Sequence, residues 1–436
     1  MISHSDYIFI ISSYFLAALS IFAFIKYKFS NQLLKGYYVF LSPLIYIHVF
    51  MFTFFGSIIA IFLTENITRL TYISEESISV YQFFVTYSTL ILFLILIPFL
   101  NKKNTHSPHF ISYIKNSSTL SSTKIIFLLL VISIYVTFKY IYYFDHSPII
   151  TSLLYNNNPL AESLRFEIQT KKIITDIPYF SKMIEILSFY IVITSYIQFR
   201  IYKENHFIII FLISVIFTGA NFLFDLQKAP LILLVLSLLL VEIAISNNKK
   251  IIYTLVGISI ITLIVIYSLF SKIDSTYLTS FISILDRTLI GQNQGFYYIY
   301  DYLPINYNNF SNWISSNNFI HADQEVIRHM KIYAGNPNIV NTNTYYLAEA
   351  WYSFGMTGLI FTPIIISFSI LIVLLIVNYL LRYNYFLFFP LALYTFLSIP
   401  ITRSFYQMIT FKYFIYILFF GVIPIYIFNK LNLRRA

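Results

Sequence analysis

This chain of 436 residues contains no cysteine, and only 11% of its residues are charged. The absence of cysteine excludes disulfide bonds, thiolate metal sites and cysteine nucleophiles. Soluble domains carry about 25% charged residues, so a soluble globule of this length would have too little polar surface to cover it. The scarcity of charge therefore places the chain among membrane proteins.

Several catalytic and nucleotide-binding motifs are also missing. The sequence has no Asp-x-Asp pair, no His-Glu-x-x-His, no Gly-rich phosphate loop ending in Lys-Ser or Lys-Thr, and no Gly-x-Ser-x-Gly. The basic residues behind the net charge of +10 are scattered between apolar runs and form no groove-sized block. Transport driven by nucleotide hydrolysis is therefore unsupported, and we expect neither a cofactor nor a nucleic-acid partner.

Hydrophobic residues make up 58% of the chain and gather in continuous apolar runs. Their lengths fit the roughly 20 residues that a transmembrane helix needs, and they lack the alternation of a membrane β-barrel. We place about eleven spans in the sequence, near residues 7–25, 38–63, 79–100, 125–144, 179–199, 206–224, 229–246, 251–270, 353–381, 384–400 and 404–428. The expected fold class is an all-α integral membrane protein, with residues 1–436 in a single polytopic membrane domain.

Lysine and arginine are divided unevenly between the segments that connect these spans. The basic segments are 26–37, 101–124, 200–205, 247–250, 382–383 and the C-terminal tail. Of the eighteen acidic residues of the chain they hold only Glu204. Because Lys- and Arg-rich loops stay in the cytoplasm, we expect the N-terminus outside and the C-terminus inside. A medium loop at 145–178 and a large loop at 271–352 then lie outside the cytoplasm.

The large loop has a density of hydrogen-bonding and ionisable groups that the other loops do not approach. These groups are Asp286, Arg287, the turn Gly291-Gln-Asn-Gln-Gly295, His321, Asp323, Glu325, Arg328 and Glu349. We expect any chemistry of this protein to take place here. His321, Asp323, Glu325 and His329 are also residue types that ligate metals, but a charged, solvated helix explains them too, and we expect no metal site.

Some basic residues lie in segments assigned to the outside, where such residues are disfavoured. The informative ones are Arg165, Lys228, Arg287, Arg328 and Arg403. Lys228 precedes Pro230 at the start of an apolar helix, and a helix N-terminus beside a lysine can bind an anion. The alternative is that Lys228 reaches lipid headgroups by snorkelling.

Lys139 and Lys412 fall inside apolar runs. Ionisable groups there are costly and often functional. Both lysines lie within reach of a membrane interface, so we expect them to snorkel to it.

Glu349 lies where the large loop turns into the span that begins near Ser353. Its neighbours on both sides are alanines and a tryptophan, so we expect a partly desolvated carboxylate with a raised pKa. Such a group suits a general base. Gly355 and Gly358 would let another helix or a substrate approach closely. The alternative is a carboxylate that is favoured only by the helix macrodipole.

Three stretches of the sequence carry a family resemblance. They are Gln227-Lys-Ala-Pro-Leu-Ile232, Asp286-Arg-Thr-Leu-Ile-Gly-Gln292 and Glu349-Ala-Trp-Tyr-Ser-Phe-Gly-Met-Thr-Gly358. They resemble bacterial oligosaccharide repeat-unit polymerases, the Wzy-type polymerases of O-antigen and capsule. The similarity covers residues 206–381 by motif and the whole chain by topology, and Glu-x-x-x-x-Phe-Gly-x-x-Gly is its most specific element.

The resemblance implies a GT-C-like membrane fold that is related to the O-antigen ligases and lies in the bacterial inner membrane, with both long loops in the periplasm. It implies a metal-independent glycosyltransferase that moves a glycan from undecaprenyl pyrophosphate onto the next lipid-linked repeat unit. The implied partners are that lipid-linked oligosaccharide, the bilayer and a chain-length regulator. The sequence departs from the ligases because it lacks an evident match to their loop histidine motif, and His321 is the nearest residue to it.

The residue types suit this chemistry. No nucleotide sugar is available outside the cytoplasm, so the donor must arrive already activated, as a lipid pyrophosphate does. Arg or Lys can neutralise the charge of that leaving group, and a carboxylate can take the proton of the acceptor hydroxyl. Glu349 is therefore the candidate catalytic base, and the candidates for binding pyrophosphate or glycan are Arg287, Lys228, Arg403, Arg165, Gln292 and His321.

Other function classes remain open at this point. A flippase for lipid-linked oligosaccharide would bury several charges along a central path and show two related halves, and it would not need a large loop on one side. An O-antigen ligase or a membrane acyltransferase is the nearer enzyme alternative. A structural assembly protein is a further alternative. The large loop and the polar cluster on one side favour an enzyme.

Overall fold

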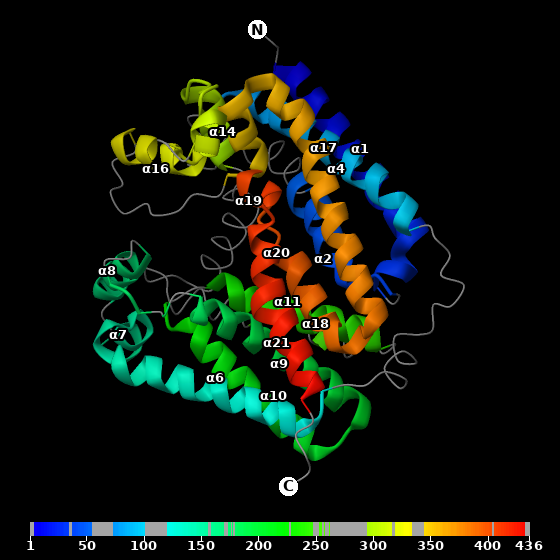
Figure 1. The fold of residues 1–436 in the computed structure, drawn as a ribbon. Helices are drawn as coiled ribbons and strands as arrows, with labels where there is room; N and C mark the ends of the chain where they lie inside the picture. The colour runs from blue at the N-terminus through cyan, green and yellow to red at the C-terminus, as the bar shows by residue number, and fades with distance from the viewer. Residues whose placement is uncertain are drawn as a thin grey trace.

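The computed structural model of the protein describes residues 4–34, 37–54, 73–100, 120–155, 158–169, 173–175, 177, 179–225, 228–246, 253–254, 257, 261, 294–315, 319–333, 344–402 and 405–431. Every secondary-structure element in these residues is a helix, and no β-strand occurs among them. The fold of this part of the chain is therefore all-α, as the apolar runs predict (Figure 1).

Long helices alternate with short helical segments along the chain, and η marks 3₁₀- and π-helical turns. In chain order they are α1 (His4–Leu34), η1 (Val39–Leu41), α2 (Ser42–Tyr46), η2 (Ile47–Phe54), α4 (Glu75–Leu100), α6 (Ser122–Tyr142), η3 (Phe144–His146), α7 (Pro148–Tyr155), α8 (Asn158–Gln169), α9 (Phe180–Tyr202), α10 (Asn205–Leu223), α11 (Lys228–Ile245), α14 (Gln294–Tyr302), α15 (Asn309–Ser315), α16 (Ala322–Tyr333), α17 (Tyr346–Tyr383), α18 (Tyr385–Leu397), α19 (Phe405–Ile409), α20 (Lys412–Ile417), η5 (Leu418–Val422) and α21 (Ile423–Lys430).

Seven helical segments among the described residues are long and apolar enough to cross a bilayer. They are Ile8–Lys28, Glu75–Phe99, Ser122–Tyr142, Phe180–Tyr202, Asn205–Leu223, Tyr346–Tyr383 and Lys412–Lys430. Two shorter apolar helices, Pro230–Ile245 and Tyr385–Leu397, accompany them. The chain is thus a multi-pass membrane protein, and the seven long segments overlap seven of the predicted spans.

The remaining predicted spans differ from these long helices. The spans at 229–246 and 384–400 form the shorter helices α11 and α18. The span at 38–63 is described only as far as Phe54, where it consists of η1, α2 and η2. Most of the span at 251–270 lies outside the described residues. The span at 404–428 is interrupted because Phe411 adopts a left-handed conformation with φ 53°, which separates α19 from α20.

The outward face of α6 carries a stripe of exposed apolar side chains. Five of them follow at intervals of three or four residues and are between 50% and 74% exposed: Phe127, Leu130, Ile134, Phe138 and Ile141. This spacing places them along one side of the helix. A continuous apolar surface of this kind is expected to face lipid rather than water.

Helix α9 lies inside the bundle, and α6, α10, α11, α18 and η5 pack against it. A helix that is apolar on all sides is expected to be buried in this way. Helix α17 packs against α4, α14, α18 and α19, and α1 lies along α4 (Figure 1). Helix α17 therefore connects the membrane bundle to the helices of the large loop.

Two pairs of opposite charge lie among these helices, and each has at least one buried member. Glu242 is fully buried, and it accepts hydrogen bonds from Nε of Arg200 at 2.8 Å and from the Tyr196 hydroxyl at 2.6 Å. Lys139 is 4% exposed, lies 3.8 Å from Asp225 and sits over the Phe224 ring at 4.4 Å. An unpaired ionisable side chain inside a membrane bundle is costly. The pairing of Glu242 with Arg200 and of Lys139 with Asp225 reduces that cost.

The prediction that Lys139 snorkels to the interface is therefore wrong. Asp225, in the turn after α10, gives it a partner inside the protein. Lys412, by contrast, is exposed at the first residue of α20, which is compatible with its expected place at an interface.

Candidate functional site

The described part of the large loop consists of the helices α14, α15 and α16, and α14 is fixed to the start of the membrane helix α4. The carboxylate of Asp301 accepts hydrogen bonds from the backbone N–H of Ser74 at 2.8 Å and from the hydroxyl of Ser77 at 3.0 Å. The Tyr300 hydroxyl donates to Glu76 at 2.8 Å. Because unpaired N–H groups point out of a helix N-terminus, Asp301 is well placed to hold the loop there.

Helix α17 is bent sharply at Gly355, which has φ 60° and ψ −142°. This conformation favours glycine because it has no Cβ. A Cβ on Gly358 would lie 2.2 Å from the backbone oxygen of Ala350, so the chain on the two sides of the bend is in direct contact. Gly355 and Gly358 thus allow the bend within α17 and the contact between its two arms. The helical segment also begins at Tyr346, earlier than the predicted start near Ser353, and Glu349 lies on the short arm before the bend.

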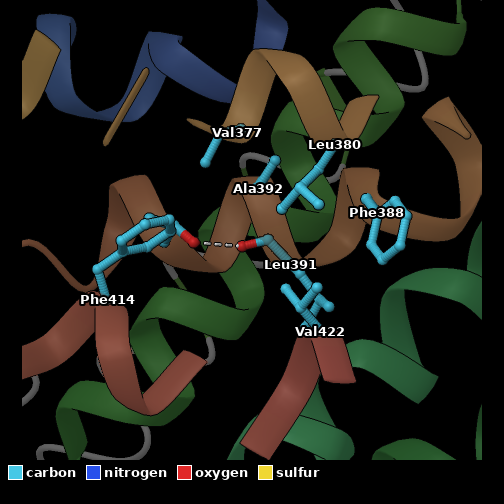
Figure 2. A pocket seen from close by; sticks show the side chains of 8 residues that line it. Val377, Leu380, Phe388, Leu391, Ala392, Phe414 and Val422 are labelled. Atoms are coloured by element: carbon cyan, nitrogen blue, oxygen red, sulfur yellow. Dashed lines mark hydrogen bonds between the residues drawn. The ribbon is translucent and has the colours of Figure 1, made fainter. Parts of the chain in front are cut away.

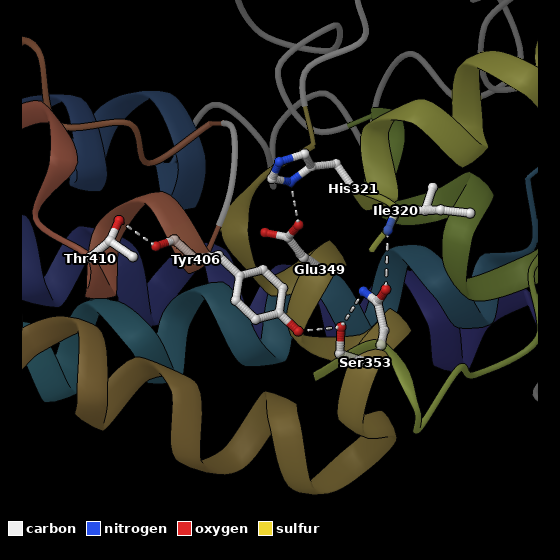
Figure 3. A network of polar contacts seen from close by, with 7 residues as sticks. Ile320, His321, Glu349, Ser353, Tyr406 and Thr410 are labelled. Atoms are coloured by element: carbon white, nitrogen blue, oxygen red, sulfur yellow. Dashed lines mark hydrogen bonds and ion pairs between the residues drawn. The ribbon is translucent and has the colours of Figure 1, made fainter. Parts of the chain in front are cut away.

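Glu349 and His321 form the polar centre of the site. Nδ1 of His321 lies 3.0 Å from Oε1 of Glu349 (Figure 3). The side chain of Glu349 is 1% exposed and that of His321 is 32% exposed. An ionised carboxylate only accepts hydrogen bonds, so this contact with an ionised Glu349 requires the proton on Nδ1. In the neutral ring, Nε2 then bears the lone pair that can accept a second proton, and this atom faces away from Glu349 in Figure 3.

The charges around His321 set its affinity for protons. The hydrogen bond to Glu349 raises the pKa of His321 above its ordinary value of 6.5, and the negative charges of Glu349 and Asp323 act in the same direction. Burial and the positive charge of Lys412 oppose this rise in the pKa. Burial also raises the pKa of Asp323. The site therefore stabilises the positive charge that His321 carries after it accepts a proton. A general base needs such stabilisation.

A second set of hydrogen bonds holds the elements around this pair together. Ser353 accepts hydrogen bonds from the amide of Asn309 at 3.1 Å and from the hydroxyl of Tyr406 at 3.0 Å (Figure 3). The side-chain oxygen of Asn309 accepts from the backbone N–H of Ile320 at 3.4 Å. These contacts join α15, α17 and α19 to the residue before His321, so they fix the backbone that carries the imidazole.

Glu325 and His329, the other residues of α16 whose side chains could ligate a metal, contact different residues. Glu325 lies 3.9 Å from Arg328, and the ring of His329 stacks on Tyr302 with centroids 5.3 Å apart. No group of three His, Cys, Asp or Glu residues within the described ranges comes together as a possible metal site.

The predicted cationic residues are placed only in part. Arg287, Gln292 and Arg403 lie outside the described residues, and so does the side chain of Lys228, whose backbone begins α11. Arg165 is on α8, which Figure 1 shows well apart from α16. Of the predicted site residues that the structure describes, it brings Glu349 and His321 together.

Sequence reasoning missed three residues of the site, Asn309, Ser353 and Tyr406. Tyr406 is one of 39 tyrosines, and Asn309 lies in an Asn-rich segment, so neither position stands out in the sequence. Ser353 stands out only as the expected start of a span. No spacing in the sequence links these residues, because they come from three different helices.

A small apolar cavity lies away from this site, between α17, α18, α20 and η5 (Figure 2). Its walls include Leu380, Leu391 and Phe414, and its volume is about 10 Å³. A space of that size holds about one water molecule. The cavity is therefore too small for a substrate, and it marks a loosely packed point beside the π-helical turn η5.

Comparison of the chain with protein-family models, with curated proteins and with solved structures gives no match.

Proposed function

We propose that this protein is a polymerase of lipid-linked oligosaccharide repeat units, a glycosyltransferase of O-antigen or capsule biosynthesis. The observation that supports this most strongly is the pairing of Glu349 with His321. The pair joins the carboxylate of the Glu-x-x-x-x-Phe-Gly-x-x-Gly element to a histidine of the large loop. It supplies a general base in the segment that the family resemblance singles out.

The burial of the two side chains supports different roles for them. Glu349 is 1% exposed, whereas His321 is 32% exposed, so His321 is the member that a substrate can reach. We propose that Nε2 of His321 contacts the acceptor hydroxyl. Glu349 then holds the ring in the tautomer that leaves Nε2 unprotonated and stabilises the charged ring once Nε2 has accepted a proton, as a carboxylate does for a catalytic histidine.

The reaction can be written with its bonds and charges balanced. The oxygen of the acceptor hydroxyl bonds to the anomeric carbon of the donor glycan, and its proton passes to Nε2 of His321. The bond from the anomeric carbon to the pyrophosphate oxygen breaks, and that oxygen keeps the electron pair. Cations stabilise the lipid pyrophosphate that leaves. Arg287, Lys228 and Arg403 remain our candidates for this task from the sequence, and Arg165 and Gln292 remain further candidates from the sequence.

The proposed place of this reaction is the periplasmic face of the bacterial inner membrane, with the N-terminus periplasmic and the C-terminus cytoplasmic. The uneven division of Lys and Arg between the connecting segments supports this orientation. The substrate would then be an oligosaccharide on undecaprenyl pyrophosphate, and a chain-length regulator would be a further partner.

Deletion of the gene in the native strain, followed by a gel of the surface polysaccharide, tests the proposal. Loss of a polymerase leaves one repeat unit on the lipid core. Loss of a ligase leaves none there, and loss of a flippase leaves precursor on the cytoplasmic side. Either of the last two results, or an unchanged polymer ladder, refutes the polymerase assignment. Complementation with the wild-type chain must restore the long polymer.

A further inference from the structure

A series of aromatic rings runs from the short helix α15 to His321. The rings of Phe310 and Trp313 are stacked with centroids 5.9 Å apart, and Trp313 lies 4.9 Å from Tyr406. The ring centroid of Phe319 lies 4.9 Å from that of Tyr406 and 4.6 Å from that of the His321 imidazole. The rings are therefore in continuous contact with the candidate base.

These rings differ in burial: one lies inside the protein and the others lie over it with part of their surface exposed. Tyr406 is 2% exposed, and its hydroxyl is bound to Ser353, so it lies beneath the others. Phe310 is 36% exposed, and Trp313 and Phe319 are partly buried. Figure 3 places the Tyr406 ring beside the pair of Glu349 and His321. The three outer rings thus rest on a fixed base and keep part of their surface accessible.

We propose that Phe310, Trp313 and Phe319 form a platform on which sugar rings of a glycan stack, next to His321. The proposal rests on the proposed function and names the binding surface that this function would use. The face of an aromatic ring carries negative charge density, and the C–H groups on the apolar side of a pyranose are weakly positive. A rigid aromatic surface beside a general base therefore fits the apolar face of a sugar.

The competing occupant of this surface is the bilayer itself. Aromatic residues gather at membrane interfaces, and Ile314 on the same helix is 65% exposed, which would suit lipid. The geometry favours the glycan, because the rings pack onto one another toward His321 and do not spread singly along an outer face. Tryptophan fluorescence separates the two occupants.

The chain contains only two tryptophans, Trp313 and Trp351, which makes fluorescence a direct test. The ring of Trp351 packs against Tyr300 with centroids 4.7 Å apart, and its indole Nε1 is buried. A Trp351→Phe variant of the full chain in nanodiscs reports on Trp313 alone. We expect its emission to change saturably when it is titrated with oligosaccharides released by mild acid from the surface polysaccharide of the native strain.

The matched control is the Trp313→Phe variant, which reports on Trp351 and should not respond. In addition, Trp313→Ala should weaken glycan binding about two- to tenfold, the range that loss of one aromatic contact implies. Calorimetry measures this affinity without a tryptophan signal. The calorimetric comparison therefore remains a test of the proposal if the Trp351→Phe variant does not fold. An unchanged affinity in Trp313→Ala, or the same fluorescence response in both single-tryptophan variants, overturns the platform.

Nanodiscs that contain brominated lipid test the other occupant. Strong quenching of Trp313 by bromine places the rings in the bilayer and overturns the proposal, whereas weak quenching supports it. Different results would refute the platform proposal and the polymerase proposal. A glycan response of Trp313 in a chain whose deletion leaves the polymer ladder unchanged supports the platform and refutes the polymerase. A deletion that stops polymerisation, together with no glycan response, refutes the platform alone.

Discussion

Gly358 lies against the backbone of Ala350 on the opposite side of the bend in α17. A methyl group on Gly358 would lie 2.2 Å from the carbonyl oxygen of Ala350 and 2.8 Å from its carbonyl carbon. Both are backbone atoms, so neither can rotate away as the end of a side chain could. This contact fixes the angle at which the arm that carries Glu349 leaves the membrane helix.

Substitution of Gly358 by alanine should therefore destabilise the protein. Overpacking of a tight contact costs about 1–3 kcal/mol, and the two backbone atoms here leave little room for relaxation. Thermal unfolding in detergent measures the loss. The matched control is Gly219→Ala in α10, where nothing lies within 4 Å of the new methyl group and where a helical alanine should be neutral or stabilising. Equal unfolding temperatures for the two variants would contradict the role of the contact.

Substitution of Glu349 by glutamine should strongly lower the polymerisation that we propose. Glu349→Gln keeps the size of the side chain and can still accept the hydrogen bond from His321, but it cannot stabilise the charged ring. A hydrogen bond to a charged group contributes about 1.5–3 kcal/mol, so we expect a decrease of roughly tenfold or more in polymer formed at equal expression. The control is Glu204→Gln, whose side chain is 58% exposed. Long polymer at the wild-type level in Glu349→Gln would remove Glu349 from the mechanism.

The pH dependence of the proposed polymerisation should follow His321. The hydrogen bond to Glu349 raises the pKa of His321 above 6.5, and only the neutral ring acts as a base. Activity should therefore rise with pH along a limb that lies above pH 6.5, and in Glu349→Gln this limb should move to lower pH. The reaction in membrane vesicles at a series of pH values measures it. A limb at the same pH in both proteins would show that another group controls the rate.

The stability contributed by His321 should have the opposite dependence on pH. A raised pKa means that the folded state binds the proton more tightly than the unfolded state. The contribution is fully present below the ordinary value of 6.5 and is lost as the pH rises through the raised value. The difference in unfolding temperature between the wild type and His321→Asn should accordingly shrink above pH 6.5. A difference that grows with pH would contradict the sign of the shift.

Removal of Arg200 should destabilise the bundle more than removal of an exposed arginine. Arg200 donates to Glu242 at 2.7 and 2.8 Å, and Glu242 has no exposed surface. Arg200→Ala would leave that carboxylate buried without its cation, which costs about 3–5 kcal/mol. Arg328→Ala, at a side chain that is 74% exposed, is the control. Similar unfolding temperatures for the two variants would mean that Glu242 finds other partners.

The orientation of the chain can be tested without removing native residues, because the chain has no cysteine. Ser311 lies on α15 in the large loop and is exposed. A membrane-impermeant thiol reagent should label Ser311→Cys in intact cells and should leave Ser117→Cys, in the segment assigned to the cytoplasm, unlabelled until the cells are opened. The reverse pattern would invert the topology and refute a periplasmic site.

The sequence alone determined that this is a helical membrane protein, and it indicated the region of the candidate site. Continuous apolar runs and the scarcity of charge predict a helical membrane protein, because backbone polar groups in lipid must be satisfied within each helix. These are local properties of the chain. Glu349 could be identified in the same way, since a carboxylate between apolar neighbours at the head of a span is unusual wherever it occurs.

Only the tertiary structure decided which groups meet. His321 precedes Glu349 by 28 residues, and the hydrogen bond between them depends on how the loop folds back onto α17. The local sequence around Lys139 favours an interfacial lysine, whereas the turn after α10 brings Asp225 to it. The bend at Gly355 was also hidden, because a glycine permits a positive φ without requiring it. Packing between distant segments selects one of the conformations that the local sequence allows, and that selection placed the carboxylate under the imidazole.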